Sequence, residues 1–260
     1  MLTIAKSGLN AALHELKVVS NNVANASSTG FKASRSSFAD SYAQASDSRP
    51  EIDTGYGTRI RESQRSHVQG SLRETGGALD VAVNGEGMFV VRRPEAPEDL
   101  QFTRNGAIEL TLEGKLVSGD GHEFLSDELT PITIPFSVED ANGRVRRLSQ
   151  ITVQDDGMIK ASYGQGVDFN LAKLGLALFS DESKLIADGS NYFRTSPGSG
   201  APDIVAPLGV HSGALEPGFL EAANVDVTNE LNLMIRAQHA FSGVSRLMQS
   251  EVEMVRKFTG

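Results

Sequence analysis

Five histidines are the residues of this chain with the widest chemical repertoire, because imidazole binds metals and carries protons near neutral pH. They are His14, His67, His122, His211 and His239. None has a second histidine or a carboxylate at a helical or hairpin metal-ligand spacing. His14-Glu15 opens like the zinc-protease helix motif, but Val18 stands where the second histidine would complete it. No metal site is predicted.

Short motifs for nucleotide binding or acid–base chemistry are incomplete. Gly114-Lys115 is followed by Leu116 where a phosphate-binding loop needs Ser or Thr, and Gly85-Glu86-Gly87 is followed by Val90 in place of a third glycine. The acidic pairs Asp155-Asp156 and Asp181-Glu182 are interpreted as solvated turns between strands. We therefore predict no catalytic residue and no cofactor, and expect that the chain is not an enzyme.

The composition is that of a globular protein able to bury a core. The 260 residues (27.7 kDa) are 39% hydrophobic and 22% charged. A net charge of −9 without any run of Lys or Arg argues against a nucleic-acid partner, and no apolar run reaches the roughly 18 residues of a membrane span. The lack of cysteine excludes disulfides and thiolate chemistry. The first residues lack the apolar core of a cleaved secretory signal, so none is expected.

The amino-terminal residues carry a helical repeat instead of a chemical motif. Apolar residues recur at spacings of three and four, which is the seam of an amphipathic helix. The members of this line that we assign to a polymerisation surface are Leu2, Leu9, Leu16, Val19 and Val23. Asn22 and Asn25, near the end of the helix, are predicted to fix register through side-chain hydrogen bonds. The Asn and Ser residues before Gly30 are expected to end the helix near residues 26–29.

The carboxyl end mirrors this pattern over a longer helix, predicted from Val227 to Phe258, or roughly 48 Å at 1.5 Å per residue. One apolar line supplies the assigned polymerisation residues Val227, Leu231, Met234, Phe241, Met248, Val252 and Val255. A second line consists of Leu233, Ala237, Ala240, Val244, Leu247 and Met254. Two lines on so long a helix exceed what the shorter helix can cover, so the helices are expected either to dock on the rest of the chain or to pack against other subunits.

Between the helices, alternating apolar residues and frequent Asn-Gly and Asp-Gly pairs predict short strands joined by tight turns. Leu79–Val83 and Met88–Val91 are predicted to pair as a hairpin across Asn84–Gly87. Ala107–Leu112 and Lys115–Val117 are predicted to form a second hairpin.

Together these patterns predict an α+β fold. Long amino- and carboxyl-terminal helices are expected to pack as one discontinuous helical domain around a central, mostly antiparallel β domain. Residues 1–35 and 222–260 are assigned to the helical polymerisation domain, 36–69 to a flexible loop and connecting segment, and 70–221 to the β domain and its return connection. Within the connecting segment, the polar residues 43–54 are expected to form the flexible loop.

Seven blocks of sequence stand out, in order along the chain: Ser7–Ala11, Ser20–Lys32, Gln69–Leu72, Thr75–Val91, Phe102–Gly106, Gly213–Glu216 and Asn224–Leu231. Together these blocks resemble the bacterial flagellar rod and hook axial proteins. The chain departs from the family's usual residues at Met88, Ala223 and Gln238–Phe241. The last departure loses an arginine and a tyrosine hydroxyl, so the polar contacts of those two groups are not carried over to this chain.

The resemblance implies a structural subunit of the flagellar basal body that self-assembles into a hollow rod and transmits torque to the hook and filament. It implies export through the flagellar secretion channel without a cleaved signal, and a place in the axial structure that crosses the periplasm. The implied partners are further copies in a helical homopolymer, neighbouring rod and hook proteins, the surrounding basal-body rings and the export apparatus.

Which member of the family the chain represents is less constrained. The length fits a rod subunit, and residues 43–54 are a candidate for a shortened version of the longer insertion that distal rod proteins carry. A distal rod protein is therefore favoured, with a proximal rod protein and a compact hook-like subunit as alternatives. A β-domain enzyme or carbohydrate-binding module with oligomerising helices is the competing hypothesis from another class. A binding module of that kind would need aromatic side chains on its β surface, and the chain has no Trp and four Tyr.

Overall fold

The computed structural model describes residues 2–42, 55–139, 144–164 and 168–259. Its contacts divide the chain into two compact units, each built from separate stretches of sequence. We call residues 1–26, 33–66 and 225–260 the helical unit, and residues 27–32 and 67–224 the β unit. The predicted α+β class is confirmed, with the terminal helices packed together and the strands antiparallel. The domain boundaries derived from the sequence stay a prediction.

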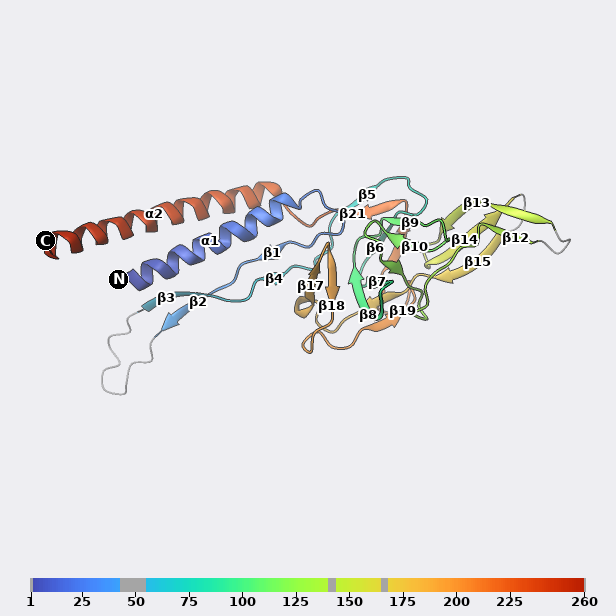
Figure 1. Ribbon diagram of the computed structural model, residues 1–260, viewed down its shortest axis with the longest axis horizontal. Helices are drawn as coiled ribbons and strands as arrows, with labels where there is room; N and C mark the ends of the chain where they lie inside the picture. Colours follow the sequence, from blue (N-terminus) through green and yellow to red (C-terminus); the bar gives the residue numbers. More distant parts are fainter. Residues whose placement is uncertain (1, 43–54, 140–143, 165–167, 260) are drawn as a thin grey trace. The chain divides into compact units, whose positions relative to one another are not determined.

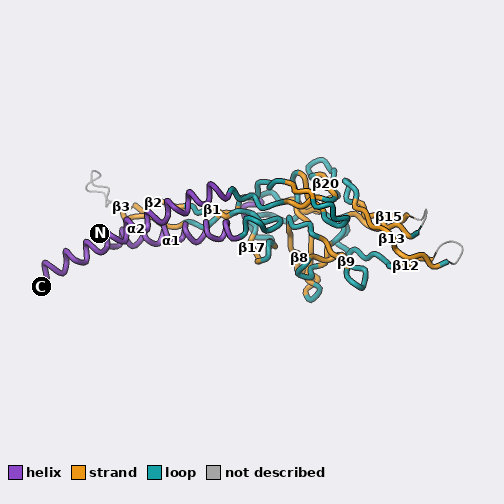
Figure 2. Tube along the Cα trace, turned by 90° about the horizontal axis from the view of Figure 1, so that it is seen from above, coloured by secondary structure: helices purple, strands orange, loops and turns teal. Residues whose placement is uncertain are grey.

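The helical unit contains the two long helices, α1 (Leu2–Ala24) and α2 (Val227–Thr259), which run side by side (Figures 1 and 2). Asp226 caps the start of α2, where its Oδ1 accepts hydrogen bonds from the backbone N–H groups of Thr228 and Asn229. The last turn of α1 ends slightly earlier than expected, although the N–H of Asn25 still donates to the carbonyl of Asn21. With 33 residues against 23, α2 is longer than α1 by roughly 15 Å at 1.5 Å per residue.

Short strands accompany the helices in this unit. β1 (Ser34–Arg35) pairs with β4 (Gln64–Arg65), and β2 (Phe38–Tyr42) pairs with β3 (Gly55–Ile60). The sequence patterns indicated only a loop and a connection here, because these strands alternate weakly and are too short to show a period. The predicted flexible loop, residues 43–54, lies outside the described residues.

The β unit is built from antiparallel sheets. The largest has nine strands, with the order β17-β18-β8-β7-β11-β10-β9 and with β16 and β19 joined to it through β7. Its strands are β7 (Met88–Arg93), β8 (Ala96–Thr103), β9 (Ile108–Leu110), β10 (Leu116–Ser118), β11 (Glu123–Phe124), β16 (Leu176–Leu178), β17 (Ile186–Gly189), β18 (Tyr192–Arg194) and β19 (Asp203–Val205). A 3-10 turn, η1 (Glu182–Lys184), precedes β17.

A second sheet and two strand pairs complete this unit. The order β12-β13-β14-β15 comprises β12 (Ser137–Glu139), β13 (Val145–Val153), β14 (Met158–Tyr163) and β15 (Asp168–Lys173). β5 (Leu72–Glu74) pairs with β21 (Phe219–Glu221), and β6 (Val81–Asn84) pairs with β20 (Ala214–Pro217). In this way two strands from the last quarter of the chain pair with two strands from its first third.

The core lies on both faces of β7, where four successive residues, Met88–Val91, are fully buried. Phe89 and Val91 belong to one apolar cluster, and Met88 and Val90 to another, because successive side chains of a strand point to opposite faces. A strand covered on both faces shows a continuous apolar run instead of an alternating one.

One predicted hairpin is confirmed and the other is wrong. β9 and β10 pair across the turn at Gly114, as expected. β6 and β7, predicted to pair across Asn84–Gly87, instead pair with β20 and with β8, β11 and β16. Gly85 and Gly87 take positive φ angles of 115° and 121° and redirect the chain, and Gly85 lies against Gly213 in a way that a side chain would block.

Glu123 is a buried carboxylate held by two cations, Arg92 at 3.0 Å and Lys115 at 2.8 Å. Burial alone would raise the pKa of Glu123, but hydrogen bonds from Lys115 and Arg92 outweigh it and hold the pKa below its usual value of 4.5. The ionised form is therefore favoured in the folded state. The stability it contributes is present above pH 4.5 and is lost as the pH falls through the lower, folded-state pKa.

We therefore expect Glu123→Gln to lower the melting temperature by several degrees at neutral pH, and by less and less as the pH falls through the lowered folded-state pKa of Glu123, where the wild-type carboxyl itself becomes protonated. Thermal unfolding of both chains across this pH range checks the prediction. A difference in melting temperature that stays constant from neutral to acid pH would contradict the prediction. Glu113→Gln is the matched control, because Glu113 is largely exposed and lies 3.8 Å from Lys115.

Candidate assembly surface

The two helices meet through small and apolar residues of the predicted lines. Ala12 and Val19 in α1 and Ala237 in α2 are buried. Neighbouring side chains on the same faces are half-buried: Leu9, Leu16 and Val23 in α1, and Leu233, Met234, Phe241, Val244 and Met248 in α2. These residues, several of them assigned from the sequence to polymerisation, thus lie on the faces by which the helices pack within the chain. The side chain of Leu2 lies outside the described part of the structure.

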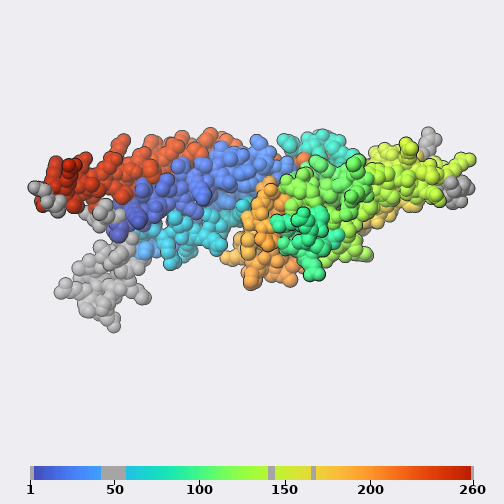
Figure 3. Space-filling model, viewed as in Figure 1, coloured from blue at the N-terminus to red at the C-terminus, as the bar shows by residue number. Residues whose placement is uncertain are grey.

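Other apolar residues of α2 remain exposed. We call Val227, Leu231 and Ile235 the start patch, and Leu247, Val252, Met254, Val255 and Phe258 the end patch. Their exposed fractions run from 42% at Val227 to 86% at Phe258. In Figure 3 the red surface of α2 lies beside the blue surface of α1. Contiguous exposed apolar side chains mark sites of protein–protein contact, so α2 presents such a surface at each end.

The two asparagines expected to fix register make hydrogen bonds within the chain. Asn22 is buried; its Nδ2 donates to the carbonyl of Ser34 at 2.8 Å, and its Oδ1 accepts from the N–H of Ser34 at 2.9 Å. The amide thus mimics a strand partner and ties α1 to β1. The side chain of Asn25 donates to the carbonyl of Asn21 one turn earlier. Both contacts order the end of α1.

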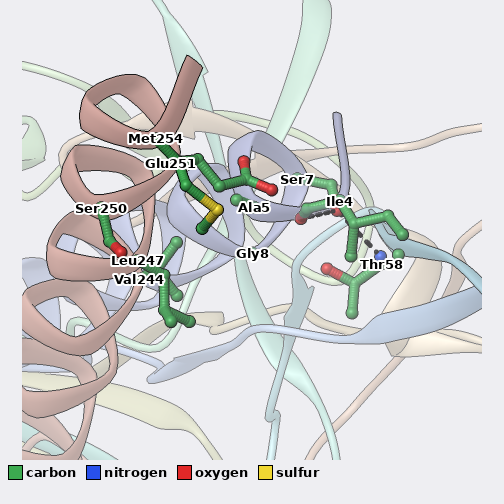
Figure 4. Close-up of a pocket in the computed structure, with 11 residues that line it drawn as sticks. Ile4, Ala5, Ser7, Gly8, Thr58, Val244, Leu247, Ser250, Glu251 and Met254 are labelled. Atoms are coloured by element: carbon green, nitrogen blue, oxygen red, sulfur yellow. Dashed lines mark hydrogen bonds between the residues drawn. The ribbon is translucent and has the colours of Figure 1, made fainter. Parts of the chain in front are cut away.

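An apolar groove of about 470 Å³ opens between α1, α2 and β3 (Figure 4). Its lining is Ile4, Ala5, Ser7, Gly8, Gly57, Thr58, Val244, Leu247, Ser250, Glu251 and Met254. Ser7 fastens one wall: its Oγ donates to the carbonyl of Ile4 at 2.7 Å and accepts from the N–H of Thr58 at 3.2 Å. The groove therefore has a fixed wall between α1 and β3.

Gly57 makes this wall possible. Its φ of +100° disfavours any other residue, and a methyl group there would overlap Ser7 Oγ. We expect Gly57→Ala to destabilise the helical unit by about 1–3 kcal/mol, measured by denaturant unfolding followed by helical circular dichroism. Gly8→Ala is the matched control, because its new methyl would meet Val244 Cγ2 at an ordinary 3.7 Å. If both substitutions lowered the free energy of unfolding equally, Gly57 would have no special role.

Among the described residues that line this groove, Glu251 is the one ionisable side chain. Its Oε2 is buried and has no hydrogen-bond partner among the described residues. Figure 4 shows Glu251 and Met254 projecting from α2 into the groove. The sequence held a signal for this residue, because position 251 continues the spacing of Val244, Leu247 and Met254 and interrupts that apolar line with a carboxylate.

The β unit contains a buried ion cluster of Lys32, Arg104 and Glu221. Lys32 Nζ lies 2.6 Å from Glu221 Oε1, and Arg104 lies 3.4 Å from Glu221 Oε2. Lys32 Nζ also donates to the carbonyl of Val68 at 3.0 Å. Burial lowers the pKa of Lys32, and the charge of Glu221 opposes this change. The cluster fastens residues 27–32 and the end of β21 into the β unit.

A polar cavity of about 580 Å³ adjoins this cluster, lined among others by His67, Glu86, Arg104, Asp181 and Glu182. Burial raises the pKa of Glu182. Within the described residues, no group of three His, Cys, Asp or Glu side chains is placed to hold a metal ion. Nor does any described helix combine the length and apolar character needed to cross a membrane.

Paired terminal helices with uncovered apolar patches, joined to an antiparallel β unit, define the class of protein that associates with other chains through its ends. The comparisons with known proteins agree with this class. Residues 2–32 match the family of flagella basal body rod proteins, residues 82–161 match the D1 domain of the flagellar hook protein FlgE/F/G, and residues 216–259 match the carboxyl-terminal region of flagellar basal body rod FlgEFG proteins.

Curated relatives match over almost the whole chain. The flagellar basal-body rod protein FlgG of Agrobacterium fabrum is 32% identical over 97% of this chain and 95% of the relative. FlgG of Buchnera aphidicola subsp. Acyrthosiphon pisum is 31% identical over 99% and 98%. The rod protein FlgF of Caulobacter vibrioides is 32% identical over 93% and 89%. The chain belongs to the flagellar basal-body rod protein family.

The function expected from the sequence is thereby confirmed at the level of the family: the chain is a structural protein of the flagellar basal-body rod and not an enzyme. The competing hypothesis of a β-domain enzyme or carbohydrate-binding module falls away, since the family match includes both the helices and the β unit. Membership of this family also implies assembly into the axial rod.

Proposed function

We propose that the chain is a distal rod subunit of the FlgG type that polymerises through its terminal helices. The observation that carries the proposal is the pair of exposed patches on α2, which α1 leaves uncovered. Burying a Leu, Met or Phe side chain supplies roughly 1.5–3 kcal/mol, and each added subunit would repeat the contact. The FlgG relatives support the member assignment, since they match nearly from end to end.

The proposal divides the sequence-derived polymerisation residues into two groups. Val227, Leu231, Val252 and Val255 are exposed and would contact other subunits directly. The half-buried Leu9, Leu16, Val23, Met234, Phe241 and Met248, with the buried Val19, would hold the helix pair in the shape that neighbours recognise. Asn22 and Asn25 would act by ordering the end of α1.

The β unit would form the outer layer of a hollow tube and stiffen it, so that torque reaches the hook and filament. Neighbouring rod and hook proteins, the surrounding rings and the flagellar export apparatus would be its partners, and the tube would cross the periplasm. The main alternative is another member of the rod, which the similarity to FlgF of Caulobacter vibrioides favours.

The test is to delete the chromosomal copy, restore it with a tagged chain, and locate the tag in isolated basal bodies. We expect loss of motility on deletion, restoration by the tagged chain, and tag label at the hook-proximal end of the rod. Label at the opposite end of the rod would favour the alternative member. Hooks and filaments that assemble normally without the chain would overturn the proposal.

A further inference from the structure

Glu251 places a carboxylate oxygen without a hydrogen-bond partner in an otherwise apolar groove. The residue as a whole is half-buried, but a carboxylate oxygen that is buried without a partner is costly, so the site is incomplete in the isolated chain. The groove walls are side chains of Ile4, Val244, Leu247 and Met254. An occupant that satisfies this site must therefore bring apolar side chains together with a hydrogen-bond donor or a cation.

The last turns of α2 carry that combination. Val255 and Phe258 are exposed and lie three residues apart, on one face of the helix. Arg256 and Lys257 are also exposed and flank this pair on its two sides, where their long side chains can reach a nearby carboxylate. Basic residues next to an exposed apolar pair are complementary to an apolar groove that contains one acid.

The end of α2 cannot enter its own groove. Glu251 and Met254 line the groove and belong to the same continuous helix as Phe258, which follows Met254 by four residues. An unbroken helix extends about 1.5 Å per residue and does not fold back on itself. An α2 end that occupies the groove must therefore come from another copy of the chain. A contact between two different surfaces of identical subunits can repeat from copy to copy, and it generates an open helical polymer where the rotation between copies does not close into a ring.

We propose that Val255, Phe258 and the basic side chains Arg256 and Lys257 of one copy dock into the groove of a second copy, and that one of the two cations pairs with Glu251. The inference rests on the proposed function and deepens it, because it names which part of one subunit meets which part of the next. In this contact the end of α2 of each subunit binds in the groove of the helical unit of its neighbour.

Photocrosslinking tests the contact directly. In Phe258→p-benzoylphenylalanine the probe keeps an aromatic ring, and it crosslinks to side chains that lie next to it. Copies labelled with light and heavy isotopes are mixed, assembled and irradiated, and the joined peptides are identified by mass spectrometry. We expect light–heavy pairs that join residue 258 to groove residues such as Met254, Val244 or Ile4. The same probe at Leu112, which is 98% exposed in the β unit, should give none of these pairs.

Other products decide against the inference. Crosslinks from residue 258 to the outer face of α1 or to the β unit of another copy would assign a different occupant or surface and overturn it. Crosslinks to the groove of the same copy in dilute monomer would also overturn it. If the wild-type chain does not enter rods at all, the proposed function fails and the inference falls with it. If rods assemble but no crosslinks to the groove form, the proposed function stands and only this inference is overturned.

Charge reversal gives an independent readout in case the probe blocks assembly. Glu251→Lys should reduce incorporation into rods by about tenfold or more, because it sets a cation against Arg256 and Lys257 of the neighbour. The triple variant that adds Arg256→Glu and Lys257→Glu restores opposite charges and should recover most of the incorporation. Helical circular dichroism of the monomers confirms that the variants fold. Failure of the triple variant to recover any incorporation, with the fold intact, would overturn the pairing.

Discussion

Replacing Glu221 with glutamine should destabilise the β unit by about 3–5 kcal/mol, the largest stability effect we expect from one substitution in this chain. Glu221 is buried with its carboxylate between Lys32 and Arg104. Glutamine has a similar size but no charge, so the two buried cations lose the carboxylate with which they form ion pairs. Differential scanning calorimetry or urea unfolding of the full chain measures the effect, which is a large share of a typical domain's stability.

The loss of stability caused by Glu221→Gln should become smaller as the pH rises. Burial already lowers the pKa of Lys32 below 10.5, and removing the charge of Glu221 should lower it further. When the folded-state pKa of a lysine lies below its unfolded value, the unfolded state binds more protons and stability rises with pH. The deficit of Glu221→Gln should therefore shrink as the pH rises toward 10.5.

The double variant Lys32→Met/Glu221→Gln is the matched control. It removes one of the two uncompensated cations and keeps an unbranched side chain of similar length at position 32. We expect it to be more stable than Glu221→Gln alone, which would be a non-additive result in a double-mutant cycle. If the two losses simply added, the three side chains would not act as one cluster.

Ala237→Asp and Leu231→Asp should separate folding from assembly on a single helix. Ala237 is 1% exposed, and a carboxylate there would be buried without a partner at a cost of several kcal/mol. We expect loss of the α-helical circular dichroism signal in that variant. Leu231 is 46% exposed in the start patch, so its variant should keep the monomer's signal and yet fail to enter rods.

The readouts are circular dichroism of the purified chain and electron microscopy of basal bodies, together with motility. Glu113→Lys, in an exposed turn of the β unit, should change neither readout. If the Leu231→Asp chain forms normal rods, the start patch is not part of the assembly surface. A fully folded Ala237→Asp chain would show that the helix pair tolerates charge at its centre and that its packing contributes little.

Where structure is set by nearby residues, the sequence alone determined it. The α2 helix spans almost the predicted residues because its apolar spacing and the Asp226 cap are local features. The β9–β10 hairpin formed as predicted because a tight turn over residues 112–114, closed by a hydrogen bond from the N–H of Gly114 to the carbonyl of Thr111, fixes both pairing and register. The family was also visible in the sequence, since its seven blocks lie in order along the chain.

The tertiary structure alone decided which partners these elements take. β6 pairs with β20, more than a hundred residues later in the sequence, and no local pattern encodes a pairing at that distance. In the same way, each apolar line of α2 contains both half-buried and exposed residues, because coverage depends on where α1 lies and where it ends. The amide of Asn22, the buried carboxylate of Glu221 and the half-buried carboxylate of Glu251 acquired their roles from neighbours distant in sequence. Spacing predicts which face of a helix is apolar, but only packing decides what covers that face.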